Sequence, residues 1–180
     1  MALKSTVYKS RLEVVDLDRH YYATHELTLA CHPSETERRL LVRLVAFALN
    51  AHERLAFGKG VSDSDEPDLW LKDLEGQIDL WIELGHPEDR TLTRACGRSR
   101  RVVVYTYSNN PHLWWDALES RASRWKNLKV VSFDAEDCAE LEALATDRTL
   151  DVQVTIQEGE IWVRGGDGVE VRLVPTVLKE

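Results

Sequence analysis

Two short apolar runs separated by a helical segment place the strongest constraint on the fold. Residues 101–107 and 128–133 are rich in Val with few charges, which is typical of buried strands. Between them, residues 111–126 carry apolar side chains at helical spacing. A strand, a helix and a second strand in this order indicate parallel strands joined by a crossover helix. The middle of the chain therefore predicts an α/β fold.

Both ends of the chain add strand patterns of a different kind. The start is rich in Val, Tyr, Thr and Leu around a short turn, and the tail alternates apolar and polar residues between turns, as antiparallel hairpins do. The expected strands cover residues 5–15, 20–30, 150–157, 160–164 and 168–174. We therefore expect one α/β domain over residues 1–180, with a mixed β-sheet flanked by helices and additional N- and C-terminal antiparallel strands.

Capping signals mark the expected helices. Ser34 and Glu37 have the spacing of a capping box and precede a segment that is apolar on most sides. Pro87 suits the first turn of another helix. Helices are predicted over residues 35–51, 87–98 and 134–147, and an irregular connector over 52–66.

Several classes of protein are excluded by what the sequence lacks. No apolar run approaches the roughly 18 residues that span a bilayer, and the first residues lack the apolar segment of a secretory signal. The three cysteines are far apart, and no zinc motif is present. We therefore expect a cytoplasmic, monomeric protein that does not contact membranes.

The net charge of −8 is concentrated in one segment. Residues 61–89 contain ten acidic residues and one basic residue, and five arginines follow directly after them. The overall charge has the wrong sign for nonspecific binding of phosphate over the whole surface. The neighbouring clusters indicate either a metal site beside an anion-binding surface or two solvated faces that neutralise each other.

The acidic segment includes a predicted β-hairpin over residues 67–85. If Glu75 and Gly76 form a two-residue turn, the strands place three pairs of side chains opposite each other on one face. These pairs are Asp68 with Glu83, Trp70 with Trp81, and Lys72 with Asp79. Facing carboxylates repel each other unless a cation lies between them. Asp68 and Glu83 are therefore candidate ligands for Mg²⁺ or Mn²⁺, which could polarise a phosphodiester and activate water.

The hairpin resembles the PD-(D/E)XK signature of the restriction-endonuclease-like superfamily. The matching residues are Pro67-Asp68 and Glu83-Leu84-Gly85, and Gly85 stands where the signature has lysine. In that superfamily the lysine is thought to position or activate the attacking water. The resemblance therefore implies a displaced base, for which Lys72 on the same hairpin is the nearest candidate and Lys59 a less constrained one.

Motifs spread over nearly the whole chain resemble the bacterial YaeQ family. They are Met-Ala-Leu-Lys-Ser-Thr-Val-Tyr-Lys, Asp-Leu-Asp-Arg-His-Tyr-Tyr, His-Pro-Ser-Glu-Thr-Glu, Glu-Pro-Asp-Leu-Trp, Trp-Ile-Glu-Leu-Gly and Ala-Cys-Gly-Arg. This resemblance implies a cytoplasmic protein with a variant PD-(D/E)XK nuclease fold. The superfamily often adds a glutamate from the helix before the hairpin, which here implies Glu35 or Glu37. Glu35 is preferred because Glu37 already serves the predicted capping box. The alternative for Glu35 is a helix-dipole contact or an ion pair with Arg39.

Further candidate residues flank the hairpin. Arg90, Arg94, Arg98 and Arg101 have helical spacing and could hold a phosphate backbone, or they could pair with the nearby acids. Trp70 and Trp81 could stack a base or form a covered cross-strand pair. Tyr105 and Tyr107 end a buried strand, where α/β sheets tend to place ligands. His32 and Ser34 lack the surroundings of a hydrolase elbow, and turn and capping roles suffice for them.

Together these patterns predict a metal-dependent nuclease-like protein that acts on or binds nucleic-acid phosphodiesters. Two alternatives remain open at this point. The fold could serve as a binding or adaptor module without catalysis, with a protein partner, because Gly85 replaces the signature lysine. The same acids could instead serve hydrolysis of a small phosphorylated metabolite.

Overall fold

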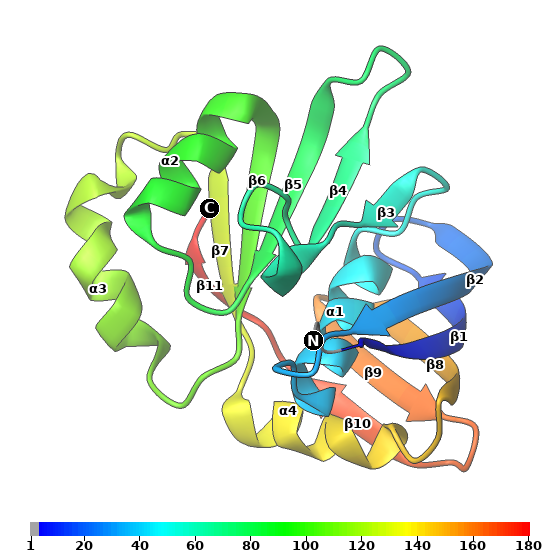
Figure 1. Ribbon diagram of the computed structural model, residues 1–180. Coiled ribbons are helices and arrows are strands. Elements are labelled where there is room, and N and C mark those ends of the chain that lie inside the picture. The colour runs from blue at the N-terminus through cyan, green and yellow to red at the C-terminus, as the bar shows by residue number, and fades with distance from the viewer. Residues whose placement is uncertain (1–3) are drawn as a thin grey trace. The chain divides into compact units, whose positions relative to one another are not determined.

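Two mixed β-sheets, one in each of two units of the chain, organise the structure, a computed structural model that describes residues 4–180 (Figure 1). The first unit comprises the described chain up to Ala51 together with Glu136–Pro175, and the second comprises His52–Ala135 and Thr176–Glu180. The α/β class and the mixed character of the pairing are confirmed. The expectation of one sheet is wrong, because the terminal strands form a sheet of their own. That residues 1–180 form a single domain stays a prediction.

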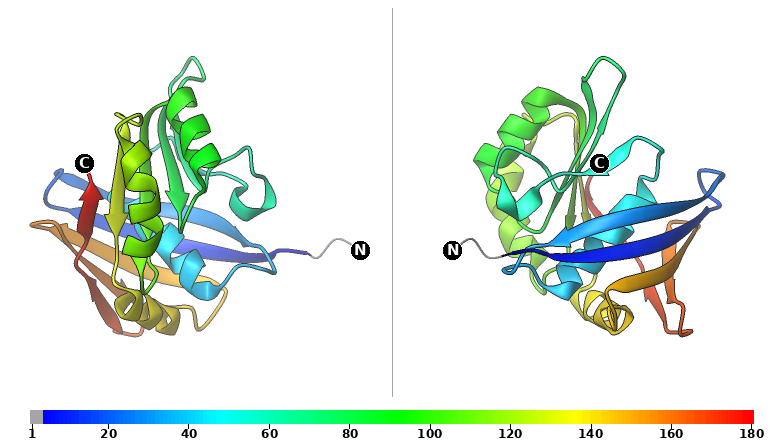
Figure 2. Two further views of the ribbon diagram at one scale, coloured as in Figure 1. Left: turned by 90° about the vertical axis from the view of Figure 1, so that its left-hand side faces the viewer. Right: turned by 45° about the vertical axis from the view of Figure 1, so that its right-hand side comes forward.

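The sheet of the first unit joins the two ends of the chain. Its order is β10-β9-β8-β1-β2. Its strands are β1 (Thr6–Asp16), β2 (Tyr21–Cys31), β8 (Thr149–Gln157), β9 (Glu160–Gly165) and β10 (Glu170–Leu173). The hairpin of β1 and β2 and the meander of β8, β9 and β10 are antiparallel, as predicted (Figure 2). The parallel pairing of β1 with β8 was not predicted, because it joins segments far apart in the sequence.

Helix α1 (Glu37–Leu49) begins later than the capping pattern predicts. Thr36 is its N-cap, with Thr36 Oγ1 accepting a hydrogen bond from the backbone N–H of Arg39 at 3.1 Å. Ser34 contacts His32 instead, so the predicted capping box of Ser34 is wrong. Helix α4 (Ala135–Glu140) is also shorter than predicted and continues into a 3₁₀ turn at Leu141–Leu144.

The sheet of the second unit contains the predicted parallel strands. Its order is β11-β7-β6-β5-β4-β3. Its strands are β3 (Leu55–Phe57), β4 (Leu69–Lys72), β5 (Ile78–Leu84), β6 (Ser99–Thr106), β7 (Leu128–Ser132) and β11 (Thr176–Lys179). Strands β5, β6 and β7 run parallel, which confirms the crossover order. Strands β3 and β11 were not predicted, because each is too short to show a periodic pattern.

Helices α2 (Asp89–Arg98) and α3 (Pro111–Ala122) cover one face of this second sheet (Figure 2). The apolar cluster beneath them includes Trp81 from β5, Val104 from β6 and Trp115 from α3. Burial of these side chains removes a large apolar area from water and fixes both helices on the sheet.

The length and apolar character of a helix determine whether it can span a bilayer. No helix in residues 4–180 is both long and apolar enough to cross a membrane.

Candidate functional site

The register of the β4–β5 hairpin agrees with the prediction over most of its length. Trp70 pairs with Trp81, and the residues on either side of this pair follow the same register. The turn is different: Asp73 and Gln77 pair through the backbone, with Gly76 at a φ of +84° in the loop between them. A residue in this conformation is typical of a three-residue hairpin loop. The register therefore shifts by one residue before Lys72.

The shift moves Lys72 away from its predicted partner. Lys72 pairs with Ile78, and its ammonium lies 3.6 Å from the centre of the Trp70 ring. Asp79 contacts Arg100 instead, so the predicted Lys72–Asp79 pair is wrong. Lys72 lies four residues along the chain from Asp68, or about 13 Å at the rise of a strand. That Lys72 is a surrogate base stays a prediction.

Asp68 lies at the start of β4 and is only 1% exposed. Its Oδ2 accepts a hydrogen bond from the backbone N–H of Leu84 at 2.8 Å, and its own N–H donates to the carbonyl of Ile82. Gly60 passes so close that a Cβ there would lie 2.8 Å from Asp68 Oδ1. The carboxylate is thus held across the carboxyl end of β5, beside Glu83.

Glu83 faces a cavity of about 270 Å³ at the same end of the hairpin. Its Oε1 accepts a hydrogen bond from the indole Nε1 of Trp81 at 2.8 Å. Three other acidic residues line this cavity, namely Asp63, Glu66 and Glu88. Lys59 Nζ lies 3.7 Å from Asp63 Oδ2 and 3.6 Å from Glu66 Oε1 and offsets part of this charge. The four acids still outnumber this one base, so the opening favours a cation over an anion.

A metal ion here would not be enclosed by the protein. Within residues 4–180, no group of three or more His, Cys, Asp or Glu side chains is arranged to hold a metal ion. The oxygen donors of Asp68 and Glu83 match the preference of Mg²⁺, which often keeps waters and takes one or two carboxylates from a protein. The donor chemistry therefore fits a hydrated magnesium or manganese ion.

The backbone at Gly85 explains why lysine is missing from the signature. Gly85 has a φ of +91°, and its N–H donates to the carbonyl of Tyr105. No atom lies within 4 Å of a Cβ added there, so only the backbone conformation disfavours a side chain. Lysine at this position would be strained by about 1–2 kcal/mol.

Glu35 is held by arginines of its own unit. Its carboxylate lies 3.2 Å from Arg39 Nη1 and 3.1 Å from Arg43 Nη2, and its side chain is 2% exposed. Glu35 precedes α1, so its backbone is outside the first helical turn in which it was expected. The ion pair with Arg39, given as the alternative, is present. A metal-binding role for Glu35 stays a prediction.

The predicted arginine stripe is split between two elements. Arg90, Arg94 and Arg98 lie on α2, whereas Arg101 lies on β6, as the predicted helix and strand bounds place them, so the helical spacing does not extend over all four. Arg94 contacts Asp65 at 2.7 Å, and Arg98 lies over the Trp81 ring. The acidic segment is thus partly neutralised by arginines, as the second interpretation of the charge pattern predicts. Binding of nucleic acid by these four residues stays a prediction.

The two hairpin tryptophans form a packed pair. Their ring centres lie 6.2 Å apart at an interplanar angle of 85°. Trp81 is fully buried beneath the two helices, so its ring has no face open for a base. The structure agrees with the covered cross-strand pair.

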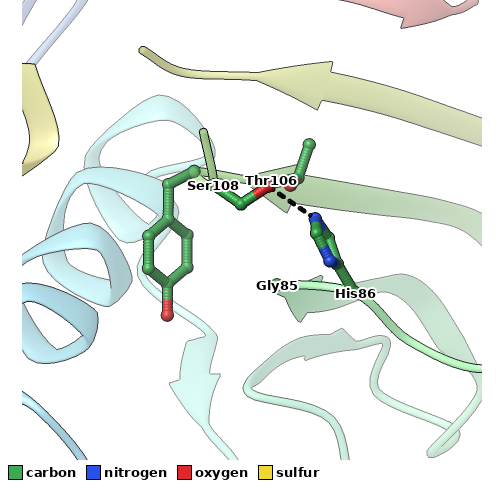
Figure 3. Close-up of a pocket in the computed structure, with 5 residues that line it drawn as sticks. Gly85, His86, Thr106 and Ser108 are labelled. Atoms are coloured by element: carbon green, nitrogen blue, oxygen red, sulfur yellow. Dashed lines mark hydrogen bonds between the residues drawn. The ribbon is translucent and has the colours of Figure 1, made fainter. Parts of the chain in front are cut away.

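A second cavity lies beside the first and was missed from the sequence. It has a volume of about 250 Å³ and is lined by Gly85, His86, Thr106, Tyr107 and Ser108 (Figure 3). The position of Tyr105 and Tyr107 at the end of a buried strand was the available signal. His86 was not among the candidates from the sequence, but it lines both cavities.

The family is decided by a match over most of the chain. The family model described as YaeQ protein matches residues 1–173. The chain belongs to the YaeQ family. The resemblance found in the sequence motifs is thereby confirmed.

Bacterial YaeQ proteins are similar to this chain over nearly their full length. The protein described as uncharacterized protein YaeQ from Escherichia coli K12 is 44% identical over 164 residues, covering 91% of this chain and 90% of the relative. The YaeQ protein of Salmonella typhi is 42% identical over 175 residues, with 96% of each chain covered.

Crystal structures of YaeQ proteins have the same fold. The protein from Xanthomonas axonopodis pv. citri has a TM-score of 0.92 at 44% identity, covering 97% of this chain and 98% of its own. The protein from Pseudomonas syringae has a TM-score of 0.90 at 36% identity, covering 98% and 97% respectively. The two mixed sheets and four helices described in residues 4–180 are therefore a YaeQ arrangement.

Proposed function

We propose that this YaeQ protein is a metal-dependent, nuclease-like protein that binds Mg²⁺ or Mn²⁺ through Asp68 and Glu83 and acts on nucleic-acid phosphodiesters. The observation that carries the proposal is the acidic cavity at the end of the β4–β5 hairpin. Of the residues that resemble the PD-(D/E)XK signature, Glu83 and Leu84 line this cavity, whereas Asp68 is buried next to Leu84 and does not line it. Its fold would then be a variant of that nuclease core.

The backbone contacts of Asp68 support a role as a fixed ligand. A carboxylate that accepts a backbone hydrogen bond across two strands cannot rotate freely. The close approach of Gly60 limits its movement further. Rigid placement lowers the cost of organising a metal site.

The position of Glu83 supports the second ligand. Trp81 holds one of its oxygens, while the side chain still lines the cavity. A bound divalent ion would polarise the phosphodiester and lower the pKa of an attacking water. The protein residues would orient that ion at the mouth of the cavity, and its positive charge would attract a phosphate that the acids alone repel.

The arginines of α2 and β6 supply the complementary charge. Arg90 and Arg101 are exposed, and no acidic side chain in the described part of the chain lies within salt-bridge distance of either. They are therefore free to meet phosphates outside the acidic cavity. Arg94 would have to exchange its contact with Asp65 for a contact with a phosphate. Lys72 as surrogate base completes the hypothesis.

The conformation of Gly85 favours a second candidate function. If no other base replaces the signature lysine, the same fold would bind nucleic acid or a protein partner without cleaving it. Hydrolysis of a small phosphorylated metabolite needs the two acids but no extended basic surface.

Calorimetric titration with MnCl₂ tests the metal site. We expect Asp68→Asn and Glu83→Gln each to weaken Mn²⁺ binding at least about tenfold, because each removes one charged ligand. Glu75→Gln is the matched control, since it removes the same charge from the exposed hairpin loop. Equal binding by all four proteins would rule out the site.

Cleavage is then assayed separately from binding. Single- and double-stranded DNA and RNA are incubated with Mn²⁺, and EDTA should abolish any cleavage. Without cleavage, the salt dependence of binding separates the candidates. Several phosphate contacts make the logarithm of the binding constant fall steeply with the logarithm of salt concentration. No binding at low salt would exclude nucleic acid as the partner.

A further inference from the structure

The cavity lined by His86 and Ser108 lies where two parallel strands end. Leu84 of β5 pairs with Tyr105 of β6, so the residues that follow each strand meet at one edge of the sheet. Figure 3 shows the side chains of His86, Thr106 and Ser108 converging on one side of this cavity. The carboxyl ends of parallel strands are a favoured place for ligands in α/β sheets.

Ser108 and His86 form a hydrogen-bonded pair in this cavity. Ser108 Oγ lies 2.9 Å from His86 Nε2 (Figure 3). The serine hydroxyl donates to this nitrogen when the imidazole carries its proton on Nδ1. This is the distance expected between a nucleophile and its general base.

The imidazole is held in place by Trp114. The rings of His86 and Trp114 are stacked, with centres 5.0 Å apart and an interplanar angle of 4°. Trp114 Nε1 in turn donates to the carbonyl of Pro87 at 3.0 Å. Burial lowers the pKa of His86, which keeps the ring neutral and able to accept a proton near pH 7.

Thr106 supplies a second and independent sign of a ligand. Its side chain is fully buried, and within residues 4–180 its Oγ1 has no hydrogen-bond partner. A buried hydroxyl without a partner costs free energy, and a bound molecule or an ion at the site is one explanation for such a group. Thr106 and Ser108 are two residues apart at a strand end and line the same cavity. The Thr106 hydroxyl can therefore donate to an oxygen bound beside Ser108.

We propose that Ser108 is a nucleophile, with His86 as its general base, that hydrolyses esters of short carboxylic acids. Ser108 Oγ attacks the carbonyl carbon while its proton passes to His86 Nε2, and Thr106 donates to the carbonyl oxygen as it becomes negative. The bond to the alcohol oxygen then breaks, and His86 returns the proton to this leaving group. Water cleaves the resulting acyl-serine in the same manner, releasing the acid and restoring Ser108.

The size of the cavity defines the substrate class. About 250 Å³ is below the usual range for pockets that hold drug-sized ligands. An acetyl to butyryl group fits this space, whereas a long acyl chain does not. We therefore expect turnover to fall sharply as the acyl chain lengthens.

Labelling with a fluorophosphonate probe tests the nucleophile directly. We expect one adduct on the folded wild-type protein, mapped to Ser108 by peptide mass spectrometry. Ser108→Ala should lose this adduct completely. His86→Phe keeps a flat ring against Trp114 but removes the base, so labelling should be about 100-fold slower or more.

The chain provides its own matched control. Ser34 Oγ lies 2.6 Å from His32 Nδ1, but this pair sits in a tight turn where the Ser34 backbone N–H also donates to the same nitrogen. Ser34→Ala should therefore leave labelling unchanged. Labelling of Ser34 instead of Ser108 would overturn the proposal. So would the absence of an adduct on protein with a wild-type circular dichroism spectrum.

Hydrolysis of p-nitrophenyl acetate and butyrate provides the second measurement. Activity should require Ser108 and His86 and should be unaffected by EDTA or by Ser34→Ala. An activity that EDTA abolishes would overturn the serine mechanism. Because no metal takes part, this outcome is independent of the result for the nuclease-like function.

Discussion

The middle of strand β5 is buried, whereas its carboxyl end is open to solvent. In the middle, Trp81 is fully buried in the apolar cluster beneath α2 and α3. Four and five residues later the chain reaches Gly85 and His86, where two cavities open to solvent. One strand thus provides both the core of its unit and the residues of its candidate sites. Packing of the core determines where the strand ends, and the residues at this end line the two cavities.

Removing the buried indole tests the structural half of this comparison and has the largest expected effect. Trp81→Ala should lower the free energy of unfolding by about 3–5 kcal/mol, because it leaves a cavity in the packed cluster. Trp70→Ala, in the half-buried partner, should cost less. Urea unfolding followed by circular dichroism measures both. Equal losses would mean that the pair, and not the core, sets the stability.

Asp68 shares features of the buried middle and of the open end of the hairpin, because its carboxylate is buried but lies at the strand end. Asp68→Ala should cost about 1–3 kcal/mol, since it leaves the buried N–H of Leu84 without its acceptor. Asp68→Asn keeps an acceptor oxygen and should be closer to the wild type in stability, while it still weakens Mn²⁺ binding. Comparing the urea midpoints of the two variants separates the structural role from the ligand role.

Two glycines of the second unit, Gly85 and Gly97, provide a matched test of backbone strain. Gly85→Ala should cost about 1–2 kcal/mol, because Gly85 has a φ of +91° and nothing else opposes a side chain. Gly97 lies in α2, where an added Cβ also meets no atom. Gly97→Ala should therefore stabilise the protein by up to about 1 kcal/mol. Thermal melting that shows the same sign for both would contradict this explanation of the missing lysine.

The sequence predicted the parts of the fold that depend on local periodicity. Alternation located β5, and helical spacing located α3, because each pattern repeats along its own element. The pairing of Trp70 with Trp81 followed from the same alternation. The predicted two-residue turn was wrong because the observed loop has three residues and ends with Gly76 at positive φ. A glycine at this position suits either loop, so the sequence does not distinguish them. The pairing of β1 with β8 depends on contacts between distant segments, which no local pattern records.

The candidate site was predicted in part for the same reason. The sequence placed Asp68 opposite Glu83 because they belong to one hairpin, and their shared role as metal ligands stays a prediction. The contact of His86 with Ser108 spans 22 residues and exists only because β5 and β6 run parallel. The sequence placed Tyr105 and Tyr107 at a strand end, but it could not show which residues from the neighbouring strand would meet them.

The pH dependence of stability is the smallest expected effect and tests the environment of His86. Burial lowers the pKa of His86 from its ordinary value of 6.5, so the folded protein binds a proton there less readily than the unfolded chain. Above pH 6.5 both states are neutral, and His86 contributes no pH dependence. As the pH falls below 6.5, the unfolded state takes up the proton first and stability is lost. Wild type should therefore lose more stability than His86→Phe between pH 7 and pH 5, measured by urea unfolding at each pH. Parallel curves for the two proteins would mean that His86 is as well solvated as in the unfolded chain. Burial would then not keep the imidazole beside Ser108 neutral.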